Sequence, residues 1–160
     1  MKKILIALDY DSTAQKVAET GHELATAMNA HTILLHVVSD PSYYATLDYS
    51  PIMGFGGFSS GDSGEANTAE ELNKVAQNYL DRSKQHLGDG EIETIVGTGD
   101  FGETILATAT RLNVDIIVMG TRGKRGLEKI LMGSVAEKVL RHSLIPLFII
   151  PTSSVEMQKS

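Results

Sequence analysis

The 160-residue sequence contains no cysteine, and no apolar run in it is long enough to cross a membrane. Without cysteine, the chain can form neither disulfides nor thiolate nucleophiles, and a cysteine-based zinc site is excluded. The N-terminus begins like a signal peptide, but the apolar run from Ile4 to Leu8 stops at Asp9, far short of the apolar core that such a peptide needs. We therefore expect a cytoplasmic protein without a membrane segment, whose fold is stabilised by packing alone.

Positive charge is also scarce. Lysine and arginine total 14 against 20 aspartates and glutamates, for a formal net charge of −6. This balance argues against a nucleic-acid-binding domain, which usually presents a broad basic face. Between Arg122 and Arg141, however, six basic residues outnumber two acidic ones. This local excess favours one site for a small anionic ligand, although solvated charges on a helix face would produce the same count.

Several motifs of catalysis are missing as well. The sequence has no G-x-S-x-G nucleophile elbow, and it has no Walker A motif because Arg125 follows Gly123 and Lys124. The five histidines are scattered, with no pair at ligand spacing on one helix, so no metal site is predicted. His36 lies inside an apolar run and is expected to be a hydrogen-bonded core histidine.

Apolar runs of strand length alternate along the chain with patterns of helical period. The runs lack a clean polar alternation, which is typical of strands buried on both faces of a parallel sheet. Asp11 or Ser12 is expected to cap the first helix. The predicted strands are Ile4–Leu8, Thr32–Val38, Ile92–Val96, Asp115–Met119 and Leu147–Ile150, and the predicted helices are Ser12–Met28, Thr68–Leu87, Gly102–Leu112 and Gly133–His142.

One segment interrupts this alternation. Residues 39–67 are too rich in glycine, serine and proline to hold a regular element, so we expect a flexible loop within a single domain spanning residues 1–151. The loop is either a lid or partner-contacting flap, or an insertion without a role. Residues 152–160 are predicted to be a disordered tail.

A second glycine pattern resembles a dinucleotide fingerprint. The segment from Gly97 to Gly102 matches G-x-G-x-x-G, follows a predicted strand and opens a predicted helix. Asp100, however, would place a negative charge where a pyrophosphate needs N–H donors. We therefore interpret the segment as a tight turn followed by a helix N-cap.

The most informative motif is G-x-x-G, nine residues and G-S, formed by Gly120, Gly123, Gly133 and Ser134 directly after a buried strand. Glycines let backbone amides approach a phosphate, and Ser134 adds a hydroxyl at a predicted helix N-terminus, where anions are favoured. In a doubly wound sheet of order 3-2-1-4-5, the ends of the first and fourth strands meet at the ligand-binding switch point. The motif and Asp9 would then share one crevice.

These residues carry a resemblance to a known family. The segment Met119–His142, followed by Pro146 and Leu147–Ile150, resembles the signature of the universal stress protein family in its ATP-binding branch, and Lys3–Asp9 falls where the family pattern places it. The resemblance implies an α/β fold, specifically a Rossmann-like (adenine nucleotide alpha hydrolase-like) three-layer sandwich with a five-stranded parallel sheet of order 3-2-1-4-5. It also implies ATP with Mg²⁺ as the cofactor and a homodimer paired through Leu147–Ile150.

The resemblance further assigns expected roles. Asp9 would meet the adenosine end, Val38 would contact adenine through its backbone, and Met119 with Gly120 would line the ribose. The phosphates would lie against Gly123, Gly133, Ser134 and Val135, with Lys124 and Arg125 adding electrostatic attraction. The expected cofactor-binding set is Ala7, Leu8, Asp9, Val38, Met119, Gly120, Arg122, Gly123, Lys124, Gly133, Ser134 and Val135.

The function expected from this set is ATP binding in the regulation of a stress response. No catalytic residue is assigned, because no side chain is an evident base for an attacking water. A slow ATPase or nucleotidyl transferase on the same fold is one alternative. A sensor of AMP or another nucleotide is the other.

Overall fold

The computed structural model describes residues 1–10, 12–39, 69–121 and 133–152. Its centre is a five-stranded sheet whose strands are β1 (Lys3–Ala7), β2 (His31–Val38), β3 (Glu93–Thr98), β4 (Ile116–Gly120) and β5 (Leu147–Ile150). All pairings are parallel and the strand order is β3-β2-β1-β4-β5. The predicted fold class and strand order are confirmed, and the predicted strand boundaries agree to within two residues.

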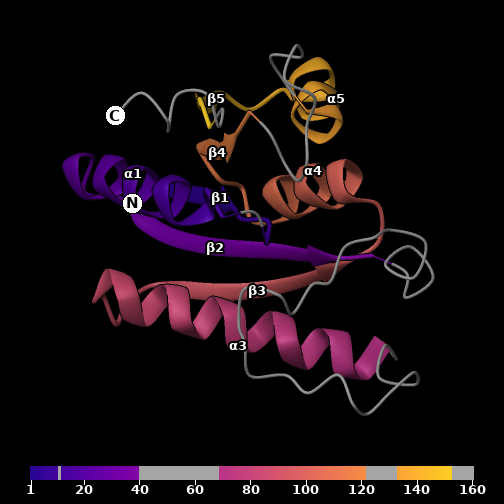
Figure 1. Ribbon diagram of the computed structural model, residues 1–160. Helices are drawn as coiled ribbons and strands as arrows, with labels where there is room; N and C mark the ends of the chain where they lie inside the picture. Colours follow the sequence, from indigo (N-terminus) through magenta and orange to yellow (C-terminus); the bar gives the residue numbers. More distant parts are fainter. Residues whose placement is uncertain (11, 40–68, 122–132, 153–160) are drawn as a thin grey trace.

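Four helices accompany the sheet in the described part of the chain. They are α1 (Ala14–Ala27), α3 (Ala69–Leu87), α4 (Phe101–Arg111) and α5 (Ser134–His142). Helix α1 packs on β1 and β4, whereas α3 lies along β2 and β3 (Figure 1). Helix α4 packs on β2 and β3 and contacts α5. This arrangement is the predicted three-layer sandwich.

Neighbouring residues along the central strands alternate between two hydrophobic clusters. Ile4 and Ile6 of β1 belong to a cluster with α1 and α3, whereas Leu5 belongs to a second cluster with α4 and α5. Val118 of β4 joins the first cluster and Met119 the second. Because side chains on a strand point to opposite faces in turn, the sheet is buried on both sides, as its continuous apolar runs predict.

Helix ends agree less well with the sequence. The N-cap of α1 is Thr13, so the prediction of Ser12 as the N-cap is wrong. The side chain of Thr13 makes no capping hydrogen bond, and Asp11 lies outside the described residues. Thr152, the first residue of the predicted tail, is buried at 1% exposure. In the described part of the chain, no helix is both long enough and apolar enough to span a membrane.

Candidate functional site

The candidate site lies where β1 and β4 end. These neighbours are consecutive in space but not in sequence, and Ile6 pairs with Val118 near their carboxyl ends. The chain runs from β1 to α1 and from β4 toward α5, so this is the point at which the direction of winding changes. In open α/β sheets, ligands bind outside the strands at this point.

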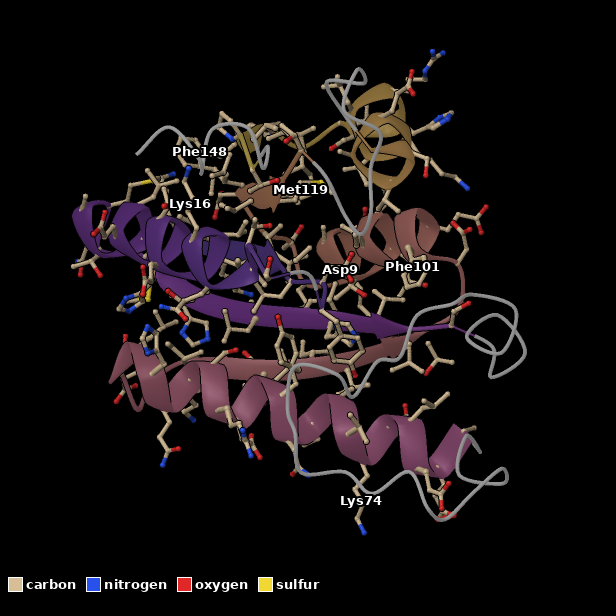
Figure 2. All side chains as sticks on the ribbon, in the orientation of Figure 1. Asp9, Lys16, Lys74, Phe101, Met119 and Phe148 are labelled. Carbon is tan, nitrogen blue, oxygen red and sulfur yellow. The ribbon has the colours of Figure 1, made fainter. Side chains whose placement is uncertain are left out.

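Asp9 stands two residues beyond β1, half-buried at the carboxyl end of the sheet. Figure 2 labels it at the same end of the sheet as Phe101, which begins α4 after β3. One carboxylate oxygen, Oδ1, accepts a hydrogen bond of 2.6 Å from the backbone amide of Tyr10. Before it, Leu8 is buried and donates its amide to the carbonyl of Leu35 on β2 at 2.9 Å.

Val38 ends β2 and is buried. Its carbonyl oxygen accepts a hydrogen bond of 3.0 Å from the amide of Gly99. A carbonyl has two lone pairs, so this bond leaves one acceptor position for another donor. Contact of the Val38 backbone with adenine stays a prediction. It would have to use a hydrogen-bonding position that the bond with Gly99 leaves free.

Met119 and Gly120 end β4, with Met119 buried in the cluster beneath α4 and α5. A Cβ atom on Gly120 would lie 3.0 Å from Cγ2 of Thr152 and 3.1 Å from Cγ2 of Val17. Both distances are tighter than ordinary side-chain contacts, so the packing of α1 and the chain after β5 already accounts for a glycine here.

The N-terminus of α5 is the second half of the site. Gly133 is the N-cap in an extended conformation and has no side chain with which to cap the helix, and Ser134 and Val135 begin its first turn. Ser134 is exposed, whereas Gly133 and Val135 are half-buried. The amide of Gly133 donates to the carbonyl of Thr121, directly after β4. Uncapped amides at a helix N-terminus attract anions, which fits the predicted contact with phosphate.

Part of the predicted set cannot be placed. Arg122, Gly123, Lys124 and Arg125 lie outside the described residues, as does the predicted loop beyond Ser39. The structure therefore brings Ala7, Leu8 and Asp9 to the end of β1, Met119 and Gly120 to the end of β4, and Gly133, Ser134 and Val135 to the start of α5. Val38 lies one strand away from Asp9, at the end of β2.

The G-x-G-x-x-G segment is the turn and N-cap that the sequence predicts. Asp100 caps α4, and its carboxylate accepts a 3.0 Å hydrogen bond from the amide of Glu103. Gly99 has a φ of +133°, a conformation that a side chain would strain. The pKa of Asp100 is lowered, first by the Glu103 amide and then by the ammonium of Lys138, 3.0 Å away. The helix end is thus occupied by its own carboxylate.

The sequence interpretation does not anticipate two contacts with the Asp9 turn. The hydroxyl of Tyr79, on α3, donates a hydrogen bond to the backbone carbonyl of Asp9. The ring nitrogen Nδ1 of His36 lies 2.8 Å from the carbonyl of Leu8. One feature of the sequence could have indicated the Tyr79 contact: a tyrosine lies on the apolar face of a helix, and a buried phenol needs a polar partner. His36 is a core residue as predicted, but its Nε2 has no partner among the described residues, so only one ring nitrogen is satisfied.

A surface hollow of about 630 Å³ lies elsewhere, lined by the C-terminal part of α3 and the turn after it, including Asp81, Lys84 and Asp89. Helix α3 runs back to the start of β3, so this hollow is at the opposite end of the sheet from Asp9. It is open and contains none of the predicted site residues.

Sequence comparison shows similarity to one known family. The model of the universal stress protein family matches residues 1–151. The chain is 31% identical over 152 residues to universal stress protein MJ0577 of Methanocaldococcus jannaschii, covering 93% of this chain and 94% of that one. It is 30% identical to universal stress protein MJ0531 of the same organism, over 93% of this chain and 81% of the relative.

Solved structures show the same similarity. The structure of MJ0577 superposes with a TM-score of 0.71 at 29% identity, covering 95% of this chain and 96% of that one. UspA from Lactobacillus plantarum superposes with a TM-score of 0.70 at 20% identity, covering 93% and 97%. A universal stress protein solved in complex with cAMP superposes with a TM-score of 0.59 at 18% identity, covering 93% and 95%.

Proposed function

The chain belongs to the universal stress protein family, and from this premise we propose that it binds ATP at the switch point between β1 and β4 as a nucleotide-dependent regulator of a stress response. One observation carries the proposal most directly: α5, whose N-cap is a glycine without a capping side chain, begins beside the end of β4, next to the strand that leads to Asp9. One end of the site offers amides for phosphate, and the other offers a carboxylate for hydroxyl or amino groups.

The proposed pose follows from these two ends. The adenosine lies toward Asp9 and Val38, and the phosphates lie over Gly133, Ser134 and Val135. A carboxylate accepts hydrogen bonds from ribose hydroxyls or from an exocyclic amine but repels phosphate, so Asp9 belongs at the adenosine end. Helix amides and a serine hydroxyl donate to phosphate oxygens. Arg122, Gly123 and Lys124 complete this set as a proposal from the sequence motif.

Magnesium fits the proposal as a companion of the phosphates. It keeps several waters and commonly binds through phosphate oxygens, so it needs few protein ligands. Ser134 is exposed at the start of α5 and supplies an oxygen on the phosphate side. The ion would neutralise the phosphate charge, and we assign it no protein carboxylate.

The proposal also includes a homodimer formed through β5. This strand is an edge of the sheet, and its Phe148 side chain is 37% exposed. An edge strand presents unpaired N–H and C=O groups, which pairing with a second copy would satisfy.

The first test is to release and identify any nucleotide that copurifies with the protein, and then to titrate ATP, ADP, AMP and cAMP with Mg²⁺ while following the melting temperature. A ligand at 100 times its Kd stabilises the native state by about 2.7 kcal/mol, which is readily measured. The solved relative with cAMP has less than a fifth of its residues identical, so cAMP enters as a probe and not as the expected ligand.

Two variants locate the ligand. Asp9→Asn should weaken ATP and AMP alike, whereas Ser134→Ala should weaken ATP more than AMP. Thr110→Ala, exposed near the end of α4 that leads back to the start of β4, is the matched control and should change neither. Equal sensitivity of AMP and ATP to Asp9→Asn, with none to Ser134→Ala, would favour an AMP sensor. Magnesium-dependent turnover lost in Ser134→Ala would favour a slow ATPase, and the absence of any bound nucleotide would contradict the proposal.

A further inference from the structure

Three aromatic rings form a cluster beneath the turn that carries Asp9. His36 comes from β2, Tyr10 follows β1 and Tyr79 comes from α3. The centroid of the His36 ring lies 4.2 Å from that of Tyr10 and 5.5 Å from that of Tyr79, and the two tyrosine rings are 5.0 Å apart. His36 is buried at 2% exposure. The nucleotide contacts proposed above use none of these three side chains.

Two members of the cluster hold consecutive backbone carbonyls. Nδ1 of His36 lies 2.8 Å from the carbonyl oxygen of Leu8, and the Tyr79 hydroxyl donates to the carbonyl oxygen of Asp9. A carbonyl oxygen can only accept, so Nδ1 must carry the proton of the imidazole. Each bond fixes the plane of one peptide group.

The two fixed peptide groups flank the Cα atom of Asp9. The Leu8 carbonyl belongs to the peptide group before Asp9, and the Asp9 carbonyl belongs to the group after it. Because a peptide group is planar, holding both groups restricts φ and ψ of Asp9 and hence the direction of its Cα–Cβ bond. The amide of Tyr10, in the second of these groups, donates to Oδ1 of Asp9 and so orients the carboxylate itself. Strand β1 ends at Ala7, so the regular ladder of β1 no longer fixes these groups.

We propose that His36 and Tyr79 are positioning residues of the adenine nucleotide site, which hold the Asp9 carboxylate in its binding direction through the Leu8 and Asp9 carbonyls. This inference rests on the proposed function, because it requires that Asp9 contact the adenosine end of a nucleotide. In this way α3 and β2 influence the affinity for the nucleoside, although neither element supplies residues to the phosphate side of the site.

The second ring nitrogen of His36, Nε2, helps to identify which nitrogen has the positioning role. Nε2 of His36 is buried without a hydrogen-bond partner in the described part of the chain. The burial lowers the pKa of His36, partly offset by the Leu8 carbonyl and the charge of Asp9, so the neutral ring is favoured. Only the Nδ1 proton therefore has a positioning role. An asparagine amide can replace Nδ1–H in place, whereas a glutamine amide reaches the position of Nε2.

The test compares Tyr79→Phe, His36→Asn and His36→Gln in calorimetric titrations with AMP and with ATP and Mg²⁺. Tyr79→Phe removes one hydroxyl and should weaken both nucleotides by the same factor, about fivefold, which corresponds to about 1 kcal/mol. His36→Gln should weaken the binding of both nucleotides in the same way. His36→Asn keeps an N–H at the position of Nδ1, so its affinities should stay within about twofold of those of the original protein.

A control separates positioning from general stability. Ile105→Val, on α4 in the cluster of the opposite face, should lower stability by about 0.5–1.5 kcal/mol without changing either affinity. Thermal unfolding of each variant gives the stability. Nitrogen chemical shifts of the His36 ring should report the proton on Nδ1.

The outcomes are distinguishable. A protein that binds neither AMP nor ATP overturns the proposed function and this inference with it. A protein that binds both, with affinities unchanged in Tyr79→Phe and His36→Gln, overturns the positioning role alone. A His36 ring protonated at Nε2 instead of Nδ1 also overturns it. If His36→Gln fails to fold, Tyr79→Phe still decides, because it keeps the ring and removes a single oxygen atom.

Discussion

The backbone amide of Thr152 donates a hydrogen bond to the hydroxyl of Thr121, with 3.1 Å between nitrogen and oxygen. The two hydroxyl oxygens are 3.3 Å apart, so the same pair also interacts through its side chains. The amide of Thr121 in turn donates to the carbonyl of Ile150, and the carbonyl of Thr121 accepts from the amide of Gly133. Thr121 therefore connects the end of the edge strand β5 to the first residue of the phosphate side of the site.

This connection predicts an asymmetry between two substitutions of Thr121. Thr121→Val removes the acceptor of the Thr152 amide, which is buried, and should lower the free energy of unfolding by about 1–3 kcal/mol. Thr121→Ser keeps the oxygen and should lower it by less. Denaturant unfolding of the two variants measures the difference, and equal stabilities would show that the hydrogen bond contributes nothing.

The close contacts of Gly120 predict a cost for a single methyl group. Gly120→Ala places Cβ within about 3 Å of Thr152 and Val17, and overpacking of this kind typically costs about 1–3 kcal/mol. Gly90→Ala is the control, because no atom lies within 4 Å of a Cβ built there. Thermal unfolding of both variants makes the comparison.

A second substitution checks the cause. If the clash with α1 destabilises Gly120→Ala, adding Val17→Ala should recover part of the lost stability even though Val17→Ala alone is destabilising. Additive losses in the double variant would instead assign the effect to the contact with Thr152 or to the backbone of Gly120.

How far the sequence predicts this fold can be judged from such positions. The apolar runs give the strands to within two residues, because burial on both faces leaves a strong signal. The glycine motif predicts a close approach of Gly120 to a ligand, whereas contacts with Val17 and Thr152 already require a glycine there. A sequence motif shows that a side chain is missing but not which neighbour fills the space.

The site was predictable only in part for a similar reason. Asp9 and Ser134 stand at element ends, where polar residues interrupt apolar patterns. Tyr79 lies 70 positions from Asp9 in the sequence and reads as one more apolar residue of a helix face. Its hydroxyl meets the Asp9 carbonyl only because α3 packs on β2 and β3 beside β1. Tertiary contacts of this kind leave no local pattern.

Burial of His36 predicts a pH dependence of stability. Its pKa in the folded protein is lowered from the ordinary value of 6.5, chiefly by burial. Below pH 6.5 the unfolded chain therefore binds a proton that the folded protein does not, and stability falls as the pH is lowered. The slope is at most about 1.4 kcal/mol per pH unit.

Comparison with His36→Asn isolates this effect. The variant should lose the His36 contribution between about pH 5 and 6.5 and keep the contributions of all other groups. Hydrogen bonds lower the pKa of Glu19, Asp89 and Asp100, with first causes His86, His22 and the Glu103 amide, so their stabilisation is lost only as the pH falls below their ordinary values near 4. Parallel curves for the two proteins between pH 5 and 6.5 would contradict the prediction.

The cap of α4 can be tested with a matched pair at Asp100. Asp100→Ala removes the acceptor of the Glu103 amide and should cost about 1 kcal/mol, as for other N-caps. Asp100→Asn keeps an oxygen acceptor and loses mainly the exposed ion pair with Lys138, which contributes little because both charges remain hydrated. Equal losses for the two variants in chemical denaturation would assign the role of Asp100 to the ion pair, which both substitutions remove.

The proposed dimer predicts a selective effect at the edge of the sheet. The carbonyl of Pro146 accepts a hydrogen bond from Ile117 of β4, and the carbonyl of Ile150 accepts one from Thr121, directly after β4. Pairing alternates along a parallel strand, so the N–H and C=O of Ile149 point away from β4. Ile149→Pro therefore removes an outward N–H without breaking the pairing with β4, and proline is tolerated on edge strands. We expect Ile149→Val to remain dimeric and Ile149→Pro to become monomeric in sedimentation velocity at one concentration. A folded Ile149→Pro dimer, or a monomeric original protein, would rule out pairing through β5.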